Sequence, residues 1–119
     1  MGPSPADDCL FCKIVAGTIS STKVYEDDDV FAFRDLTPVA PTHVLVIPKR
    51  HIVGADHLAD GDGDVLCKMF VAAKAVADGE GVSETGYRTV FNVGAHAGQT
   101  VPHLHLHVLG GRGMTWPPG

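Results

Sequence analysis

Residues 103–109 alternate histidine with an apolar residue, in the order His-Leu-His-Leu-His-Val-Leu. Successive side chains of a β-strand point to opposite faces of the sheet. A strand here therefore puts His103, His105 and His107 on one face and apolar side chains on the other. Buried imidazoles need hydrogen-bond partners, so three in a row are a poor choice for simple packing. The segment predicts a core strand with one chemically active face, rather than a surface strand with incidental histidines or an expression tag.

From the pattern alone, this histidine face fits three kinds of site. Alternate residues of a strand can direct two imidazoles to one zinc ion. An imidazole with a pKa near ~6.5 also suits nucleophilic or acid–base chemistry at neutral pH. The glycine-bearing segment 94–98 lies just upstream, so an anion-binding site is the third possibility. The three kinds of site do not exclude one another.

The remaining pattern predicts an α+β domain. Apolar residues at helical spacing indicate a short helix from residue 9 that stops near Gly17 and a long helix over about 64–77 that stops near Gly79 or Gly81. Strands are expected at 24–25, 30–33, 43–47, 87–92 and 102–109. Several connections are too short for parallel crossovers, so an antiparallel sheet of about five strands fits best. We expect a flexible tail over 1–8 and a single domain over 9–119.

Charge and hydropathy exclude several classes of partner. The formal net charge is -5, which argues against a nucleic-acid binder. No apolar run approaches the ~20 residues that span a bilayer, so no membrane partner is expected. No secretory signal is visible and the chain has 3 cysteines, so we expect a reducing, cytoplasmic setting without disulfides.

The histidine segment resembles the signature of the histidine triad (HIT) family, and the resemblance extends from Cys9 to Gly119. The ending Trp-Pro-Pro-Gly at 116–119 is similar to the branch called histidine triad nucleotide-binding proteins. Further matching segments are Phe33-Arg34-Asp35, Ala40-Pro41-Thr42-His43, Val46-Ile47-Pro48-Lys49-Arg50-His51, Asn92, Gly98-Gln99-Thr100 and Gly110-Gly111-Arg112. The resemblance implies a HIT-like fold, a homodimer and a purine nucleotide substrate.

The resemblance also implies a reaction, the hydrolysis of the P–N bond in AMP or GMP amides (possible substrates include aminoacyl adenylates). His105 matches the nucleophile that forms a nucleotidyl-histidine intermediate. His107 matches a phosphate contact, and His43 matches an imidazole that orients or protonates the centre. Thr100 matches a hydroxyl near the leaving group, where the branch usually has serine.

Other residues match the family's nucleotide contacts. Asp35 corresponds to the carboxylate that accepts the ribose hydroxyls, and Asn92 and the Gly98 backbone correspond to phosphate and sugar contacts. Trp116 corresponds to an indole that reaches the partner's active site. The apolar base pocket corresponds to Leu10, Phe11, Ile14, Phe33 and Leu36.

Cysteines 9 and 12 form a Cys-x-x-Cys pair, which alone is compatible with a redox motif or with half of a zinc site. Family members that carry this pair bind structural zinc. By that resemblance the ligands are Cys9, Cys12, His51 and His103. Cys67 on the long helix is expected to be a small core residue. His57 and His96 receive no role.

Three alternatives to the phosphoramidate hydrolase remain open. The sister branch of the superfamily cleaves dinucleoside polyphosphates. A non-catalytic, regulatory purine nucleotide-binding module would not need His105. A zinc hydrolase needs an open coordination position, which four protein ligands would not leave.

Overall fold

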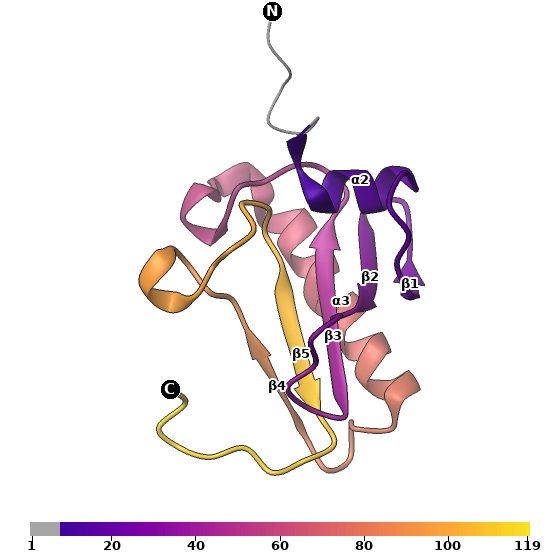
Figure 1. Ribbon diagram of the computed structural model, residues 1–119, viewed down its shortest axis with the longest axis vertical. Helices are drawn as coiled ribbons and strands as arrows, with labels where there is room; N and C mark the ends of the chain where they lie inside the picture. The colour runs from indigo at the N-terminus through magenta and orange to yellow at the C-terminus, as the bar shows by residue number, and fades with distance from the viewer. Residues whose placement is uncertain (1–7) are drawn as a thin grey trace, which may run out of the picture.

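The computed structural model describes residues 8–119. The expected tail over 1–8 lies outside the described residues, apart from Asp8. A five-stranded antiparallel sheet has the order β1-β2-β3-β5-β4 (Figure 1). The strands are β1 Lys23–Glu26, β2 Val30–Arg34, β3 Thr42–Pro48, β4 Tyr87–Val90 and β5 Leu106–Gly110. The predicted α+β class and antiparallel sheet are confirmed.

Helix α3, Gly63–Glu80, packs across one face of the sheet, and helix α2, Leu10–Ala16, lies at one end of the other face (Figure 1). Both helices end where the sequence predicts a stop. Gly17 and Gly81 adopt φ values of +81° and +74°, the left-handed conformation that glycine reaches without steric cost. No helix of the described chain is long and apolar enough to cross a membrane.

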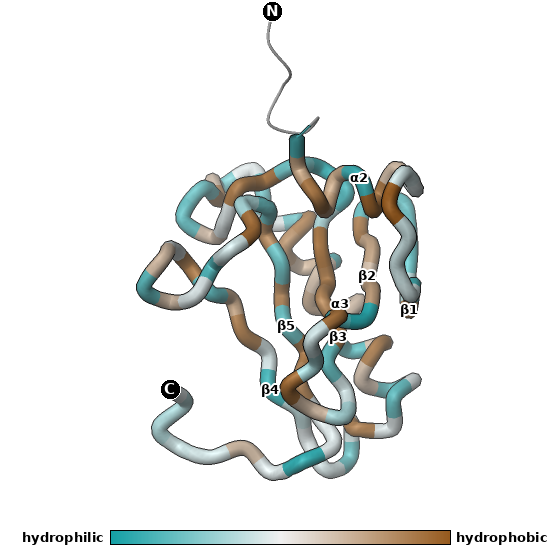
Figure 2. The backbone as a smooth tube through the Cα atoms, viewed as in Figure 1, coloured by the Kyte–Doolittle hydropathy of each residue, from teal (hydrophilic) through white to brown (hydrophobic). Residues whose placement is uncertain are grey.

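The central strand β3 is buried along its whole length, and its hydrophobic character stands out in Figure 2. Its alternating side chains enter two separate cores. Val44 and Val46 pack toward α3, whereas Leu45 and Ile47 pack toward α2. The α2 side is therefore a second layer, in which aromatic and sulfur-bearing side chains lie next to the histidines.

The histidine strand begins later than predicted. The ladder starts at Leu106, not at 102, because Pro102 has no N–H to donate and the His103 N–H bonds to the Val101 carbonyl. The alternation nevertheless continues through the bend. Leu104 enters the α3-side core, while His103 and His105 face the α2 side.

Strand β4 also ends early, at Val90 instead of 92, because Val90 pairs with His107 near the start of β5 and little strand remains beyond it. On α3 the expectation for Cys67 is wrong, since this side chain is exposed. Cys67 shares its outward face with Val71, one turn later, whereas Met69 and Ala73 point into the core.

Candidate active site

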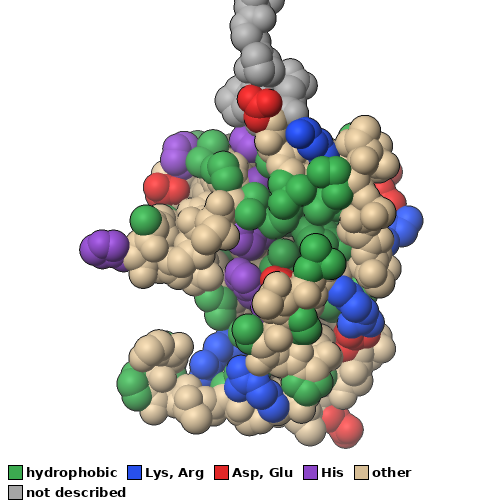
Figure 3. Space-filling view, viewed as in Figure 1, with side chains coloured by type: hydrophobic (Ala, Val, Ile, Leu, Met, Phe, Trp, Pro, Cys, Tyr) green, Lys and Arg blue, Asp and Glu red, His purple; other side chains and the backbone are tan. Residues whose placement is uncertain are grey.

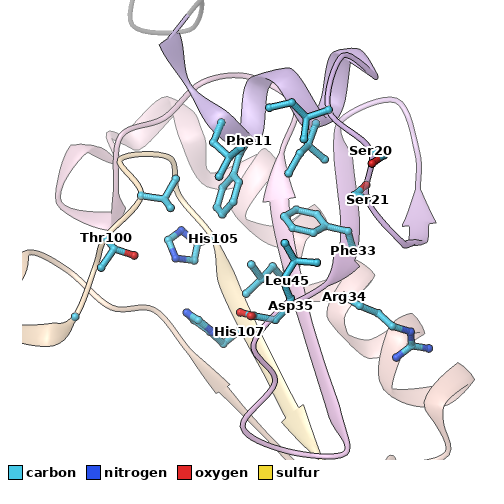
Figure 4. Close-up of a pocket in the computed structure, with 16 residues that line it drawn as sticks. Phe11, Ser20, Ser21, Phe33, Arg34, Asp35, Leu45, Thr100, His105 and His107 are labelled. Carbon is cyan, nitrogen blue, oxygen red and sulfur yellow. The ribbon is translucent and has the colours of Figure 1, made fainter.

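A cavity of about 280 Å³ opens on the α2 side of the sheet, where Figure 3 shows imidazoles gathered in a hollow beside apolar side chains. Most predicted nucleotide-site residues line it: Leu10, Phe11, Ile14, Phe33, Asp35, Leu36, Gly98, Thr100, His105 and His107. The cavity is thus assembled from the start of the chain, the end of β2, the loop before β5 and β5 itself (Figure 4).

Three predicted site residues lie outside this lining. Asn92 follows β4 and is half-buried. His43 does not line the cavity, but its ring contacts His107, which does. Trp116 is 82% exposed on the C-terminal segment. Leu36 lines the cavity but is itself 95% exposed, so it borders the opening without forming a wall.

Aromatic rings form the apolar wall. Phe11 of α2 contacts Phe33 of β2 edge-to-face at a centroid distance of 5.4 Å, and it contacts His105 in the same manner at 5.2 Å. Such edge-to-face contacts hold rings in defined orientations. Phe11 therefore lies between the apolar wall of the cavity and the side lined by histidines.

The backbone fixes which nitrogen of His105 is basic. His105 Nδ1 lies 2.6 Å from the His103 carbonyl oxygen. A carbonyl only accepts hydrogen bonds, so Nδ1 carries the proton. In the neutral form the lone pair is then on Nε2. His105 is buried yet lines the cavity, an arrangement that would suit a nucleophile.

A second chain of hydrogen bonds orients His107. The Val39 N–H donates to His43 Nδ1 at 3.1 Å, which leaves the proton of His43 on Nε2. His43 Nε2 then donates to His107 Nδ1 at 2.9 Å. His107 must therefore carry its own proton on Nε2. That buried atom has no hydrogen-bond partner within residues 8–119, so it is available to an acceptor in the cavity.

Both histidines of this chain are held neutral. The pKa of His107 is lowered to about 4, mainly by burial and also by the nearness of His105 and His43, while Asp35 opposes the shift. Burial also lowers the pKa of His43, against the attraction of Asp35. Neutral imidazoles at neutral pH agree with the hydrogen-bond directions described above.

Asp35 stands at the end of β2, at the edge of the cavity. Its Oδ1 accepts the Thr37 N–H at 2.8 Å, and its Oδ2 lies 3.4 Å from His43 Nε2. The Asx-turn at Asp35 engages Oδ1, and the His43 Nε2 proton goes to His107, so Oδ2 keeps lone pairs that can accept from a hydroxyl donor. Asp35, His43 and His107 also group closely enough to suggest a metal site. However, His43 Nε2 and His107 Nδ1 are committed to each other, so the hydrogen-bond chain explains the cluster without a metal.

The four predicted zinc ligands come together. In the described chain, Cys9, Cys12, His51 and His103 each place a ligand atom within 4.8 Å of the others. His103 Nδ1 lies 3.2 Å from Cys9 Sγ and 3.5 Å from Cys12 Sγ, and His51 Nδ1 lies 3.3 Å from Cys12 Sγ. Tetrahedral zinc would separate sulfur and nitrogen ligands by about 3.6 Å.

The tautomer of His103 also suits a metal. Its Nε2 lies 2.9 Å from the Pro48 carbonyl oxygen and must donate to it, so Nδ1 presents a lone pair to the two sulfurs. Burial lowers the pKa of His103 to about 4, which keeps the imidazole neutral. The residues present fit a Cys₂His₂ zinc site.

Sequence reasoning missed several residues of the cavity. Ile19, Ser20, Ser21, Arg34, Leu45 and Val101 also line it. The serines follow the helix stop at Gly17 and carry no pattern of their own. Leu45 could have been found, because it shares a strand face with His43 and pairs directly with His107.

Comparisons with known proteins show the family. The family model described as HIT domain matches residues 16–114. The 14 kDa zinc-binding protein of Brassica juncea is 46% identical over 114 residues, which cover 94% of this chain and 100% of the relative. The adenylylsulfatase HINT1 of Arabidopsis thaliana is 43% identical over 122 residues, which cover 100% of this chain and 82% of the relative.

Two solved structures are similar in fold. A HIT family hydrolase from Legionella pneumophila Philadelphia 1 superposes with a TM-score of 0.92 at 54% identity, covering 94% of this chain and 100% of that one. A histidine triad nucleotide-binding protein from Candida albicans superposes with a TM-score of 0.79 at 33% identity, covering 92% and 83%.

Proposed function

Because the chain belongs to the HIT domain family, we propose that it is a nucleotide hydrolase that cleaves the P–N bond of purine nucleoside phosphoramidates. One observation carries the proposal. His105 offers an unprotonated Nε2 to the same cavity in which the neighbouring His107 offers an unpartnered Nε2–H. A nucleophile beside a donor suits attack on a phosphoryl group, whose charged oxygens need stabilisation.

The cavity suggests how the nucleotide is held. The base would lie against the apolar wall of Phe11, Ile14 and Phe33. The ribose hydroxyls would meet the carboxylate of Asp35, which lies between that wall and His107 (Figure 4). The α-phosphoryl oxygens would accept from His107 Nε2 and from the backbone near Gly98.

The reaction would proceed in two displacements. In the first, the lone pair of His105 Nε2 forms a bond to phosphorus and the P–N bond to the substrate amine breaks. The amine leaves with a proton that the Thr100 hydroxyl donates and regains from solvent. In the second, water attacks the nucleotidyl-histidine and gives up a proton to solvent, and the His105–phosphorus bond breaks. The products are the nucleoside monophosphate and the free imidazole.

We propose that Cys9, Cys12, His51 and His103 hold a structural zinc ion. Such an ion ties α2 to the segment that carries the nucleophile, and it contributes to folding without an open position for substrate. His103 would then serve the metal through Nδ1, while its carbonyl orients His105. Thiolate ligands need a reducing compartment, so the proposal includes a cytoplasmic location.

A second candidate substrate is adenylyl sulfate, because a relative that aligns with the whole of this chain is named an adenylylsulfatase. The same attack by His105 on the α-phosphorus would release sulfate instead of an amine. Dinucleoside polyphosphates are less favoured, since a cavity of about 280 Å³ is at the small end for ligand sites. A non-catalytic module would not need the basic Nε2 of His105.

We further propose a homodimer in which α3 and β4 face a second copy. On α3, Phe70 and Val71 are 43% and 58% exposed, and Phe70 contacts Phe91 just beyond β4. Strand β4 also lies at the edge of the described sheet, where an unpaired strand favours association. In such a dimer the exposed Trp116 would extend toward the partner's cavity.

Product release from a matched substrate panel tests the function. The panel holds adenosine constant and varies the leaving group: an adenosine phosphoramidate, adenylyl sulfate and a diadenosine polyphosphate. We expect AMP release to be fastest from the phosphoramidate. Fastest release from adenylyl sulfate would assign the second candidate, and binding of AMP without turnover of any substrate would contradict the enzyme proposal.

A further inference from the structure

The loop that precedes the histidine segment projects away from the sheet, as the orange segment in Figure 1 shows. It contains the short 3₁₀ turn η3, Ala95–Ala97, and two glycines, Gly94 and Gly98, with φ values of +80° and +90°. Gly98 and Thr100 nevertheless line the active-site cavity. A projecting loop that contributes to a site must be held in position by contacts with the rest of the chain.

The side-chain amide of Gln99 makes three hydrogen bonds that fix the loop. Its Nε2 donates to the Val53 carbonyl at 3.0 Å and to the Val101 carbonyl at 3.2 Å. Its Oε1 accepts the Gly94 N–H at 3.0 Å, which closes the loop on itself. Within residues 8–119, Gln99 is the loop side chain whose hydrogen bonds reach the rest of the chain.

Gly54 packs closely against this amide. A Cβ built on Gly54 would lie 3.0 Å from Asp56 Oδ1, 3.2 Å from Gln99 Nε2 and 3.3 Å from Gln99 Oε1, tighter than ordinary packing. Gly54 has a φ of -175°, an extended conformation that any residue adopts. Glycine at this position is therefore explained by close packing against the Asp56 and Gln99 side chains rather than by backbone strain.

We propose that Gln99 is a positioning residue, which holds the loop so that Gly98 and Thr100 face the phosphoryl group of the nucleotide. This inference rests on the proposed function, because it assigns the phosphoryl group to that part of the cavity. Gln99 does not line the cavity itself and acts through its two neighbours. The base and ribose sites, formed by Phe33 and Asp35, lie on a different element and should not depend on it.

Ligands that differ only in the phosphate separate positioning from general stability. Gln99→Met keeps the length of the side chain but removes all three hydrogen bonds. We expect the Kd for AMP to rise roughly tenfold, since each lost neutral hydrogen bond costs a factor of several in an equilibrium constant. The Kd for adenosine should stay within twofold of the native value, and both can be measured by titration calorimetry.

Gly54→Ala tests the same contact from the other side, because its methyl group would crowd both the Gln99 amide and Asp56 Oδ1 and shift them by a few tenths of an ångström. It should reproduce the AMP-specific loss at smaller size. Ser83→Ala is the control: it removes a side-chain hydrogen bond to Asp78 in a turn remote from the cavity, and both affinities should stay unchanged.

Equal weakening of AMP and adenosine, or no change in either, would overturn the positioning role of Gln99. A native chain that binds neither AMP nor adenosine would instead overturn the proposed function and the inference with it. A native chain that binds AMP but does not hydrolyse phosphoramidates would refute the chemistry alone and leave the Gln99 comparison decisive.

Discussion

Replacement of His43 by phenylalanine tests the hydrogen-bond chain that orients His107. Phenylalanine fills the ring volume but cannot accept from the Val39 N–H or donate to His107 Nδ1. His107 then has no partner that requires its proton on Nε2. In the other tautomer, Nε2 presents a lone pair to the phosphoryl oxygen, and the stabilising hydrogen bond becomes a repulsion.

The expected loss of activity follows from the hydrogen bond that His107 Nε2 would no longer donate to the phosphoryl oxygen. A hydrogen bond to a charged acceptor contributes about 1.5–3 kcal/mol. At about 1.4 kcal/mol per factor of ten, kcat/KM should fall by about 10- to 100-fold. The assay is steady-state release of AMP from an adenosine phosphoramidate.

The matched control is His57→Phe, the same substitution on the exposed turn η1, Ala55–His57. It should leave kcat/KM unchanged. Nitrogen-15 spectra of the imidazoles report the tautomer directly: native His107 should be protonated on Nε2, and the His43→Phe variant should show a mixture. A variant with kcat/KM within twofold of native and His107 still protonated on Nε2 would refute the reasoning.

Three further predictions concern the metal, pH and assembly. Cys12→Ser should reduce bound zinc from about one ion per chain to almost none and lower Tm by about 10 °C, whereas Cys67→Ser, at an exposed position, should change neither. Metal analysis and calorimetry measure the two quantities, and a Cys12→Ser variant that retains both zinc and Tm would contradict the ligand set. The pKa of His107 is lowered from 6.5 in the unfolded chain to about 4 in the folded chain. As the pH falls, the unfolded chain therefore binds a proton first, and the stability that depends on a neutral His107 is lost between pH 6.5 and pH 4. From pH 7 to pH 5 the free energy of unfolding should therefore fall by about 2 kcal/mol more in the native chain than in His107→Asn; equal slopes in urea denaturation at fixed protein concentration would count against a neutral, buried His107. Val71→Asp should convert the dimer to a monomer in sedimentation experiments, and a native chain that is monomeric at micromolar concentration would rule out the proposed interface.

Local patterns predicted the fold well where neighbours in sequence decide the structure. The helix stops at Gly17 and Gly81, the apolar face of α3 and the buried strand β3 all follow from residue spacing and glycine conformation. The errors fall where tertiary pairing decides. The start of β5 depends on the lack of a donor at Pro102 and on the bond from Leu104 N–H to the Ile52 carbonyl, and no local pattern contains that contact.

The site divides in the same manner. The alternation of histidines correctly predicted that His103, His105 and His107 share a side of the sheet. The resemblance named the four residues whose ligand atoms come close enough to hold a metal ion. The tautomers could not be predicted, because they depend on the Pro48, Val39 and His103 backbone atoms. The exposure of Cys67 was missed because helical spacing alone does not say how far the sheet covers a helix.

The central claim is that His105 attacks phosphorus through Nε2, and trapping the intermediate tests it most directly. Native protein mixed with an adenosine phosphoramidate, quenched in denaturant within the first turnovers and digested should yield a peptide that carries one adenylyl group on His105 in the mass spectrum. His105→Ala should give no adenylylated peptide and at least about 1,000-fold slower AMP release, although it still binds AMP. An adenylyl group on another residue, or near-native turnover by His105→Ala, would contradict the account.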